Sequence, residues 1–393
     1  MLTWLAPLLV FGLVVFVHEL GHFLAAKAVG VYAPVFSIGW GSRLWGRKIG
    51  ETEYRLSWFP IGGYVAMASR EDEMMSALEG GGNAPTDTAP DATGPRKGLQ
   101  PIPWDPNAMA PFGPRRVPQE RWIESKSIAA RLLVMSAGVL MNIVLAIVVA
   151  SGIFAIYGKS YLPPVLSRVL PDKPAARAGL MAGDSIVAVN GTPLRTWTEL
   201  LDKVGASAGQ ELVLDVRRAG QPLEIRVTPE ATASQDPATG IPTTLGRIGA
   251  APVDRVRKEP MGLGASLAAG TVTTWNMAGS VGKVLRGLFT GGVSVKQLGG
   301  PIAIARTSVQ AAKSGVETLF GLIAFLSINI AILNLLPIPL LDGGQIVMAI
   351  GEGIRGKPFS ERARELFAKV GIAMVGLLFA LVMLNDVTAL FRR

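Results

Sequence analysis

The sequence lacks cysteine altogether and has only two histidines among its 393 residues. Disulfide bonds and thiolate metal sites are therefore excluded. Charge is also scarce, since charged residues make up 17 % of the chain, against about 25 % in an average soluble protein. Hydrophobic residues reach 49 %. This imbalance predicts several apolar segments that are buried away from water.

Four segments are apolar over the roughly 20 residues that a helix needs to cross a bilayer. They run approximately over residues 2–26, 129–157, 316–336 and 370–390. A cleaved signal peptide is the alternative for the first of them. No Lys or Arg precedes Lys27, however, and a signal peptide begins with a basic region. We therefore expect four transmembrane helices.

The net charge of +9 is best explained by membrane topology. Basic residues such as Arg43, Arg47 and Lys48 follow the first span, and Arg355 and Lys357 lie between the third and fourth spans. Cytoplasmic loops carry an excess of Lys and Arg. This distribution predicts that both loops are cytoplasmic and that both termini lie outside. Nucleic acid is not an expected partner.

The chain is expected to be a polytopic α-helical membrane protein with a small membrane-associated β region and one extracytoplasmic α+β domain. Period-two patterns and turn residues predict the strands, and a run of Gly, Ala, Pro, Thr and Asp predicts a flexible insertion. The expected order is transmembrane helix 1 (1–30), β-hairpin region (31–68), flexible cytoplasmic insertion (69–118), transmembrane helix 2 (129–157), soluble domain (162–230), linker (231–260), amphipathic juxtamembrane region (261–315), transmembrane helix 3 (316–345) and transmembrane helix 4 (365–391).

Both histidines lie in the first span, within "HELGH" at residues 18–22. Four residues apart on a helix, His18 and His22 share one face, and two imidazoles at this spacing can bind one Zn²⁺. Glu19 is then placed to take a proton from water on the metal, as in His-Glu-x-x-His metalloproteases. A packing role for the polar residues is the alternative. Ionisable groups inside a membrane span are functional by default, so the pattern predicts a catalytic zinc site.

A catalytic zinc needs three protein ligands, and the sequence leaves a carboxylate as the third. Asp342, in "NLLPIPLLDGGQ" at the end of the third span, is the best candidate. Pro337 and Pro339 break the helix before it. Backbone that is unwound at membrane depth must be buried in protein or line a wet cavity, and it could meet an extended peptide there.

A peptide bond inside a membrane helix must be unwound before it can be hydrolysed, so a strand edge is a natural partner for it. The alternation of Tyr54, Leu56 and Trp58 predicts such a strand. The side chain of Asn334 could bind the substrate backbone, or equally an adjacent helix.

With these residues the chain resembles the site-2 protease family of intramembrane zinc metalloproteases, in particular the bacterial regulator-of-sigma-E type. "HELGH" and "NLLPIPLLDGG" carry the resemblance, and "SIGWG", "IGGYV" and "KQLGGPIAIA" extend it. In "SAGVLMN" (136–142), Val139 stands where many relatives have proline. The resemblance covers most of the chain except residues 69–118.

The resemblance implies that His18, His22 and Asp342 bind zinc, that Glu19 is the general base, and that Asn334, Pro337 and Pro339 hold the unwound substrate. It also implies a zinc metalloendopeptidase of the bacterial inner membrane that acts in regulated intramembrane proteolysis. The substrates would be single-pass membrane proteins, such as anti-sigma factors or signal-peptide remnants, trimmed first by a site-1-type protease. The active site would open toward the cytoplasm.

The soluble domain resembles a permuted bacterial PDZ domain, on the stretch "PDKPAARAGLMAGDSIVAVNG". PDZ domains capture an extended chain end by strand addition, and the groove would lie near Val165, Leu166, Val169 and Leu170. A spacer that excludes untrimmed substrates is the equal alternative. The best-known relatives carry two PDZ domains in tandem, whereas this chain has room for one.

Two other classes of protein remain possible on sequence alone. In a transporter, His18, Glu19, His22 and Asp342 would form a proton or metal relay, but the paired half-repeats of such proteins are not found. In a membrane-anchored adaptor, the PDZ domain would act and the metal site would be dead. Zinc content separates the adaptor, and Glu19→Gln separates the relay, from a protease.

Overall fold

The computed structural model describes residues 2–68, 117–235, 242–294 and 299–391. It divides into two compact units, one made of residues 1–150 and 298–393 and the other of residues 151–297. The predicted insertion at 69–118 lies almost entirely outside the described residues. In the part that is described, four helical stretches are long and apolar enough to cross a membrane: Thr3–Ala28, Ile128–Tyr157, Val316–Leu335 and Arg362–Ala389.

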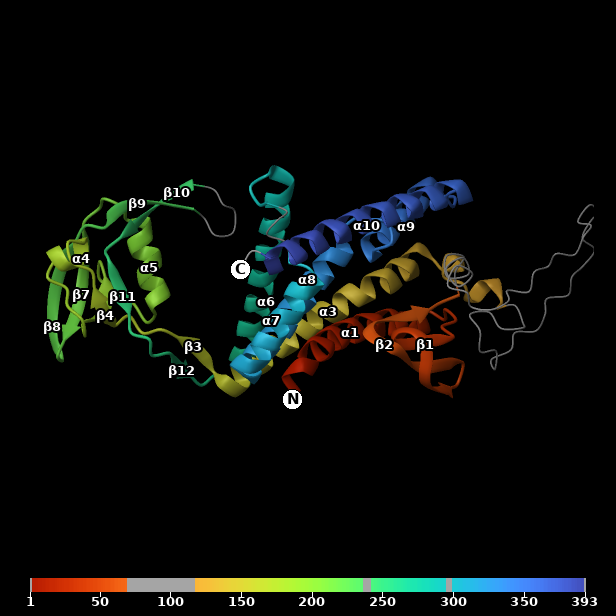
Figure 1. Cartoon of the computed structure of the whole chain (residues 1–393), viewed down its shortest axis with the longest axis horizontal. Helices are drawn as coiled ribbons and strands as arrows, with labels where there is room; N and C mark the ends of the chain where they lie inside the picture. Colours follow the sequence, from red (N-terminus) through yellow and green to blue (C-terminus); the bar gives the residue numbers. More distant parts are fainter. Residues whose placement is uncertain (1, 69–116, 236–241, 295–298, 392–393) are drawn as a thin grey trace, which may run out of the picture. The chain divides into compact units, whose positions relative to one another are not determined.

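The first unit is built around α1 (Ala6–Ala28), α3 (Ile128–Tyr157) and α8 (Val316–Leu335), which lie side by side (Figure 1). Val10 and Val14 of α1 pack against Ile323 and Leu326 of α8. Around this core lie η1 (Leu2–Leu5), η2 (Gln119–Arg121), η3 (Ile123–Ser125), α7 (Pro301–Ser314), α9 (Asp342–Arg355) and α10 (Glu361–Phe391).

A small antiparallel sheet follows α1 in this unit. It contains β1 (Val35–Ile49) and β2 (Thr52–Ala66), which pair along most of their length. β2 folds back, so that Val35 pairs with both Glu53 and Ala66. Residues 63–66 therefore form an edge of the sheet, next to the start of β1. β2 also packs against α1, and Val65 of this edge lies in one apolar cluster with Phe23.

The second unit has a four-stranded sheet in the order β6-β5-β7-β8. A core of apolar side chains, including Leu166, Ile186, Leu200 and Leu214, lies between this sheet and α5. The elements in chain order are β3 (Lys159–Tyr161), β4 (Leu166–Val169), α4 (Pro174–Arg177), β5 (Ser185–Val189), β6 (Thr192–Pro193), α5 (Trp197–Ala206), β7 (Leu212–Arg218) and β8 (Gln221–Val227).

The predicted linker at 231–260 differs in the structure, because most of its described residues are paired strands. β9 (Glu230–Gln235) pairs with β10 (Pro242–Arg247), β11 (Ala250–Pro252) with β4, and β12 (Arg257–Glu259) with β3. The segment is rich in Ala, Thr and Gly, whose small side chains give no clear period-two signal, whereas backbone pairing does not need large side chains. Ile248 is its contribution to the core.

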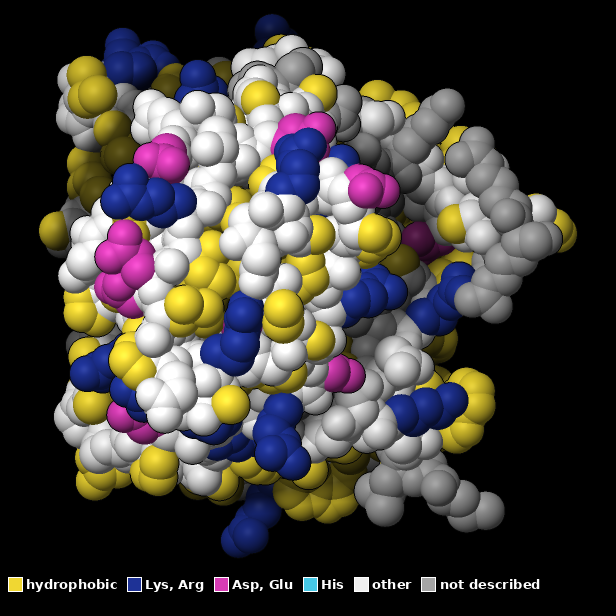
Figure 2. All heavy atoms as spheres, turned by 90° about the vertical axis from the view of Figure 1, so that its left-hand side faces the viewer, with side chains coloured by type: hydrophobic (Ala, Val, Ile, Leu, Met, Phe, Trp, Pro, Cys, Tyr) yellow, Lys and Arg dark blue, Asp and Glu magenta, His cyan; other side chains and the backbone are white. Residues whose placement is uncertain are grey.

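Helix α6 (Leu263–Thr290) completes the second unit, within the predicted juxtamembrane region. Two of its large apolar side chains, Trp275 and Leu263, expose 79 % and 83 % of their surfaces. Figure 2 shows a face of the second unit on which basic and acidic side chains are interspersed.

Candidate metal centre

Two turns of α1 carry the imidazoles of the candidate site. No Pro or β-branched run interrupts "HELGH", so the helix continues through it and places His18 and His22 on one face. Both residues are buried, with 5 % and 7 % of their surfaces exposed. Their Nε2 atoms lie 3.2 Å apart.

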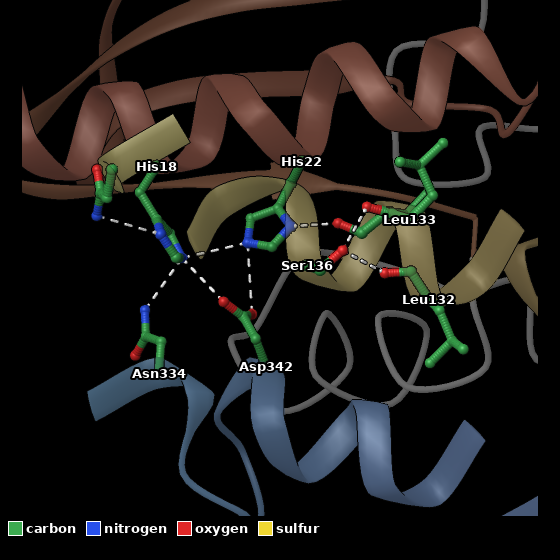
Figure 3. A network of polar contacts seen from close by, with 9 residues as sticks. His18, His22, Leu132, Leu133, Ser136, Asn334 and Asp342 are labelled. Carbon is green, nitrogen blue, oxygen red and sulfur yellow. Dashed lines mark hydrogen bonds and ion pairs between the residues drawn. The ribbon is translucent and has the colours of Figure 1, made fainter. Parts of the chain in front are cut away.

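Asp342 is brought to these imidazoles by a break in the chain between α8 and α9. Residues 336–341 are not helical, as Pro337 and Pro339 require, and Leu340 has a left-handed backbone with φ of 76°. Asp342 then begins α9. Its Oδ2 lies 3.2 Å from Nε2 of His18, and its Oδ1 lies 3.4 Å from Nε2 of His22. Figure 3 shows the three side chains converging from two elements.

The geometry of these three side chains fits a divalent metal. One ligand atom from each can be chosen so that all lie within 4.8 Å of one another. Bonds of about 2.0–2.2 Å in a tetrahedron place zinc ligands roughly 3.3–3.6 Å apart, close to the separations seen here. Oδ2 of Asp342 is also buried without a hydrogen-bond donor among the described residues. A cation would satisfy that oxygen.

The crossing of α1 and α3 holds the imidazoles in place. Nδ1 of His22 donates to the backbone carbonyl of Val134, 2.8 Å away, so its Nε2 is free to bind a metal. A Cβ at Gly138 would overlap the rings of both histidines, and a Cβ at Gly21 would overlap the backbone of Ala137. This role of Gly138 was not predicted from the sequence. Its only sequence signal is a glycine within an otherwise apolar span.

Glu19 faces a cavity of about 440 Å³ that also exposes the three candidate ligands. Val65, on the sheet edge, lines the same cavity as this carboxyl group. Further lining residues include Asn334, Leu340, Gln345, Arg131 and Glu352. A carboxylate therefore stands beside the candidate metal ligands in a space that could hold water and a peptide.

The predicted strand residues lie elsewhere on the sheet. Tyr54 and Leu56 belong to a segment that is paired on both sides, with Phe36 and Ile38 on one and Arg47 and Trp45 on the other. Trp58 is 64 % exposed. The edge that lines the cavity is instead the end of β2, through Val65, followed by Met67. Among the described strands, none pairs with the outer side of this edge.

The other predicted substrate residues lie around the break between α8 and α9. Asn334 lines the cavity, and its Nδ2 lies 3.1 Å from Nε2 of His18 (Figure 3). Pro337 is exposed and Pro339 is buried, and neither contributes to the cavity wall as described. The two prolines shape the backbone that carries Leu340, Leu341 and Asp342 into the wall.

A buried ion-pair cluster closes the far side of the cavity. Glu352 of α9 accepts hydrogen bonds from Arg131 at 2.7 Å, from Arg364 at 2.6 Å and from the backbone N–H of Phe359 at 3.0 Å. Burial alone would raise the pKa of Glu352, but these donors and the two guanidinium charges hold it below its usual value. The cluster ties α3, α9 and α10 together around the site.

A second cavity, of about 810 Å³, lies in the second unit between α5 and the segment from Leu245 to Ala250. Of the predicted groove residues, Leu170 lines this cavity. Leu166 is fully buried in the core, Val169 packs against that core, and Val165 forms an isolated bridge with Ser185. The cavity wall is therefore made mainly by segments other than 165–170.

Comparison with known proteins agrees with this geometry. Residues 6–378 match the family described as Peptidase family M50. The chain is 32 % identical to the "Regulator of sigma-W protease RasP" of Bacillus subtilis over 434 aligned positions, which cover 99 % of both chains. It is 33 % identical to the "Zinc metalloprotease RasP" of Bacillus licheniformis over 433 positions, again covering 99 % of each.

The described fold and site are those of a membrane metalloprotease of the site-2 protease type. The chain belongs to peptidase family M50. The PDZ domain of the SdrC-like protein of Listeria innocua is also similar, at 19 % identity, with coverage of 24 % of this chain and 96 % of that one and a TM-score of 0.19.

Proposed function

We propose that this protein is an intramembrane zinc metalloprotease that cleaves transmembrane segments of single-pass membrane proteins. The observation that carries the proposal is the convergence of His18, His22 and Asp342, with Glu19 beside them, on one cavity. Three of these residues belong to a helix that is apolar enough to span a membrane. Hydrolysis at this site would take place within the membrane.

His18 and His22 would hold zinc through their Nε2 atoms and Asp342 through a carboxylate oxygen, which leaves one position open. When bound there, zinc would polarise the scissile carbonyl and make water more acidic. Glu19 would accept the proton of the attacking water and deliver it to the leaving nitrogen. General acid–base catalysis of this kind contributes about 10²–10⁴-fold to a rate.

The substrate would be held in an extended form beside this centre. The edge of β2 near Val65 offers backbone hydrogen-bonding groups along the cavity wall, and strand addition to such an edge is a common mode of peptide recognition. Asn334 would contact the substrate backbone from the other side. Tyr54, Leu56 and Trp58 would then support the edge from within the sheet, and Pro337 and Pro339 would keep the facing segment unwound.

A role in regulated intramembrane proteolysis follows from this chemistry and from the relative that is named a regulator of sigma-W protease. The substrate class would be anti-sigma factors or signal-peptide remnants that a site-1-type protease has trimmed. The basic loops favour an inner-membrane protein with both termini and the PDZ domain outside and the active site open to the cytoplasm. The PDZ domain would either capture a trimmed end or exclude untrimmed chains.

The test is cleavage of a tagged single-span peptide by the purified full-length protein in detergent with one equivalent of zinc. Wild type should cut the peptide. Glu19→Gln should bind zinc equally and lose about 10²–10⁴-fold in rate, whereas Asp342→Asn should lose zinc. Glu365→Gln, on the exposed face of α10, is the control that should change neither property.

The same variants separate the rival functions. A metal or proton relay would transport its ion across the membrane of a vesicle, and Glu19→Gln would abolish this transport. Neither wild type nor any variant would then cleave the peptide. An adaptor would bind peptide without zinc. Zinc-loaded wild type that leaves every single-span peptide intact would refute the protease.

A further inference from the structure

Asn142 of α3 lies against the side of His18 that faces away from Asp342. It is fully buried, with 0 % of its surface exposed. Its side-chain nitrogen, Nδ2, lies 3.4 Å from Nδ1 of His18. Nε2 of the same ring points at Asp342. Asn142 and Asp342 therefore address opposite nitrogens of one imidazole.

The neighbouring His22 shows which tautomer a metal-binding histidine needs at this site. Its Nδ1 faces the carbonyl of Val134, and a carbonyl can only accept, so Nδ1 carries the proton and Nε2 carries the lone pair. His18 must adopt the same tautomer if its Nε2 is to bind a metal. Its Nδ1–H then needs an acceptor, and metal-binding histidines almost always have one.

The carboxamide of Asn142 can supply that acceptor. With nitrogen toward the ring, two donors would face each other, while Oδ1 is buried without a donor among the described residues. The two ends of a carboxamide have the same shape, so a half-turn about its last bond exchanges them. The exchange brings an acceptor to Nδ1–H and removes the contact between two donors.

We propose that Asn142 is a positioning residue of the metal site, whose Oδ1 accepts the Nδ1–H of His18 and fixes the tautomer that presents Nε2 to the metal. The proposal rests on the zinc site of the proposed function. Asn142 touches no reacting atom and would act only through His18.

The backbone around Asn142 holds it in this place. Ser327 of α8 donates from Oγ to the carbonyl oxygen of Asn142 at 2.8 Å, and Ser327 is itself fully buried. Gly138, one turn earlier on α3, admits both imidazole rings. Gly138 and Asn142, which "SAGVLMN" spaces four residues apart, thus form one face of α3 that receives the two histidines. This assigns a function to a motif that the zinc ligands alone leave unexplained.

The experiment measures zinc affinity, by competition with a chromogenic chelator, on full-length protein in detergent. Asn142→Leu has a similar volume and no acceptor, and it should bind zinc about 10–100-fold more weakly. Asn142→Asp keeps an acceptor at the same place and should stay within a few-fold of wild type. Gly152→Ala, on the same helix α3, adds a methyl group that meets no atom within 4 Å; it is the matched control and should keep wild-type affinity.

Cobalt substitution gives a second readout that does not depend on activity. The visible absorption bands of Co²⁺ in Asn142→Asp should match wild type, and those in Asn142→Leu should be shifted or weakened. If Asn142→Leu is not recovered folded, Asn142→Ala gives the same comparison.

Each outcome decides the proposal. The proposal would be overturned if Asn142→Leu and Asn142→Asp both bound zinc as tightly as wild type. It would also be overturned if Asn142→Asp bound zinc as weakly as Asn142→Leu, because Asn142 would then act by packing. Wild type that binds no zinc would refute the metal site itself, and with it both proposals. Wild type that binds zinc while the acceptor proves irrelevant would refute only the role of Asn142.

Discussion

The two units of this chain differ in the polar groups they bury and in the apolar side chains they expose. In the first unit, His18, His22, Asn142 and Ser327 are buried polar residues, while α10 exposes Leu377 and other large apolar side chains. In the second unit the buried side chains around the four-stranded sheet are mainly apolar, and the buried carboxylate of Asp184 is paired with Arg218. Charged side chains are spread over the face seen in Figure 2. The difference is the one expected if lipid surrounds the first unit and water the second.

The contrast explains where the chemistry lies. In water, burial of apolar side chains is the main stabilising term, so a soluble domain uses its interior for packing. Lipid tails are as apolar as leucine, so a membrane unit gains little from sorting its side chains in that way. Its interior is free to hold polar groups that pair with one another. A hydrolytic site can therefore occupy the centre of the first unit.

The largest expected effect comes from removing apolar volume in the second unit. Leu214 is fully buried in its core, and Leu214→Ala should destabilise that unit by about 2–5 kcal/mol. Leu377→Ala removes the same atoms from α10, where 64 % of the leucine surface is exposed, and should change stability by less than about 0.5 kcal/mol. Hydrogen exchange of the amides of β7 and α10 in the full chain measures both. Equal effects at the two positions would break the contrast between the units.

In the first unit, the sensitive position is a glycine that makes room for polar rings. Gly138→Ala places a methyl group against His18 and His22. Overpacking costs about 1–3 kcal/mol, and here the cost falls on the metal site, so zinc affinity should drop by at least about tenfold. Gly152→Ala, on the same helix, meets no atom within 4 Å and should leave zinc affinity unchanged. Zinc titration of the two variants is the measurement, and undiminished affinity in Gly138→Ala would contradict the described crossing of α1 and α3.

A buried carboxylate gives the second unit a dependence on pH. Arg218 donates to Asp184 at 2.7 and 2.8 Å, and this hydrogen bonding lowers the pKa of Asp184 below its usual value of about 3.9. Because the folded pKa is depressed, the carboxylate stabilises the unit fully above about pH 4, and this stabilisation is lost as pH falls through the depressed value. Asp184→Asn should lower the melting temperature of the second unit at pH 7 and flatten its decline below pH 4. Parallel melting curves of wild type and variant across that range would refute this role of the ion pair.

Much of the site could be predicted from the sequence because its residues are chemically distinctive. Two histidines and a glutamate in an apolar span, with one aspartate after a proline break, leave few alternatives for a metal site. The positions of Gly138, Asn142 and Leu340 could not be predicted, because their roles depend on which helices cross and on backbone angles. The strands β9–β12 were missed for a related reason: their small side chains carry no periodic signal, and their stability comes from pairing with segments distant in the sequence.

The smallest expected effect concerns the start of α5, where Thr196 is the N-cap and Thr198 lies two residues later. Oγ1 of Thr196 accepts from the backbone N–H of Glu199 at 3.2 Å, whereas α1 begins without a side-chain cap. Thr196→Ala should therefore destabilise the second unit by about 1 kcal/mol, and Thr198→Ala by much less. Thermal unfolding of the second unit, monitored by limited proteolysis, compares the two variants. The first amides of a helix have no partner within the helix, and Thr196 satisfies one of them in α5. A larger effect at Thr198 would therefore mean that packing, rather than capping, fixes the start of α5.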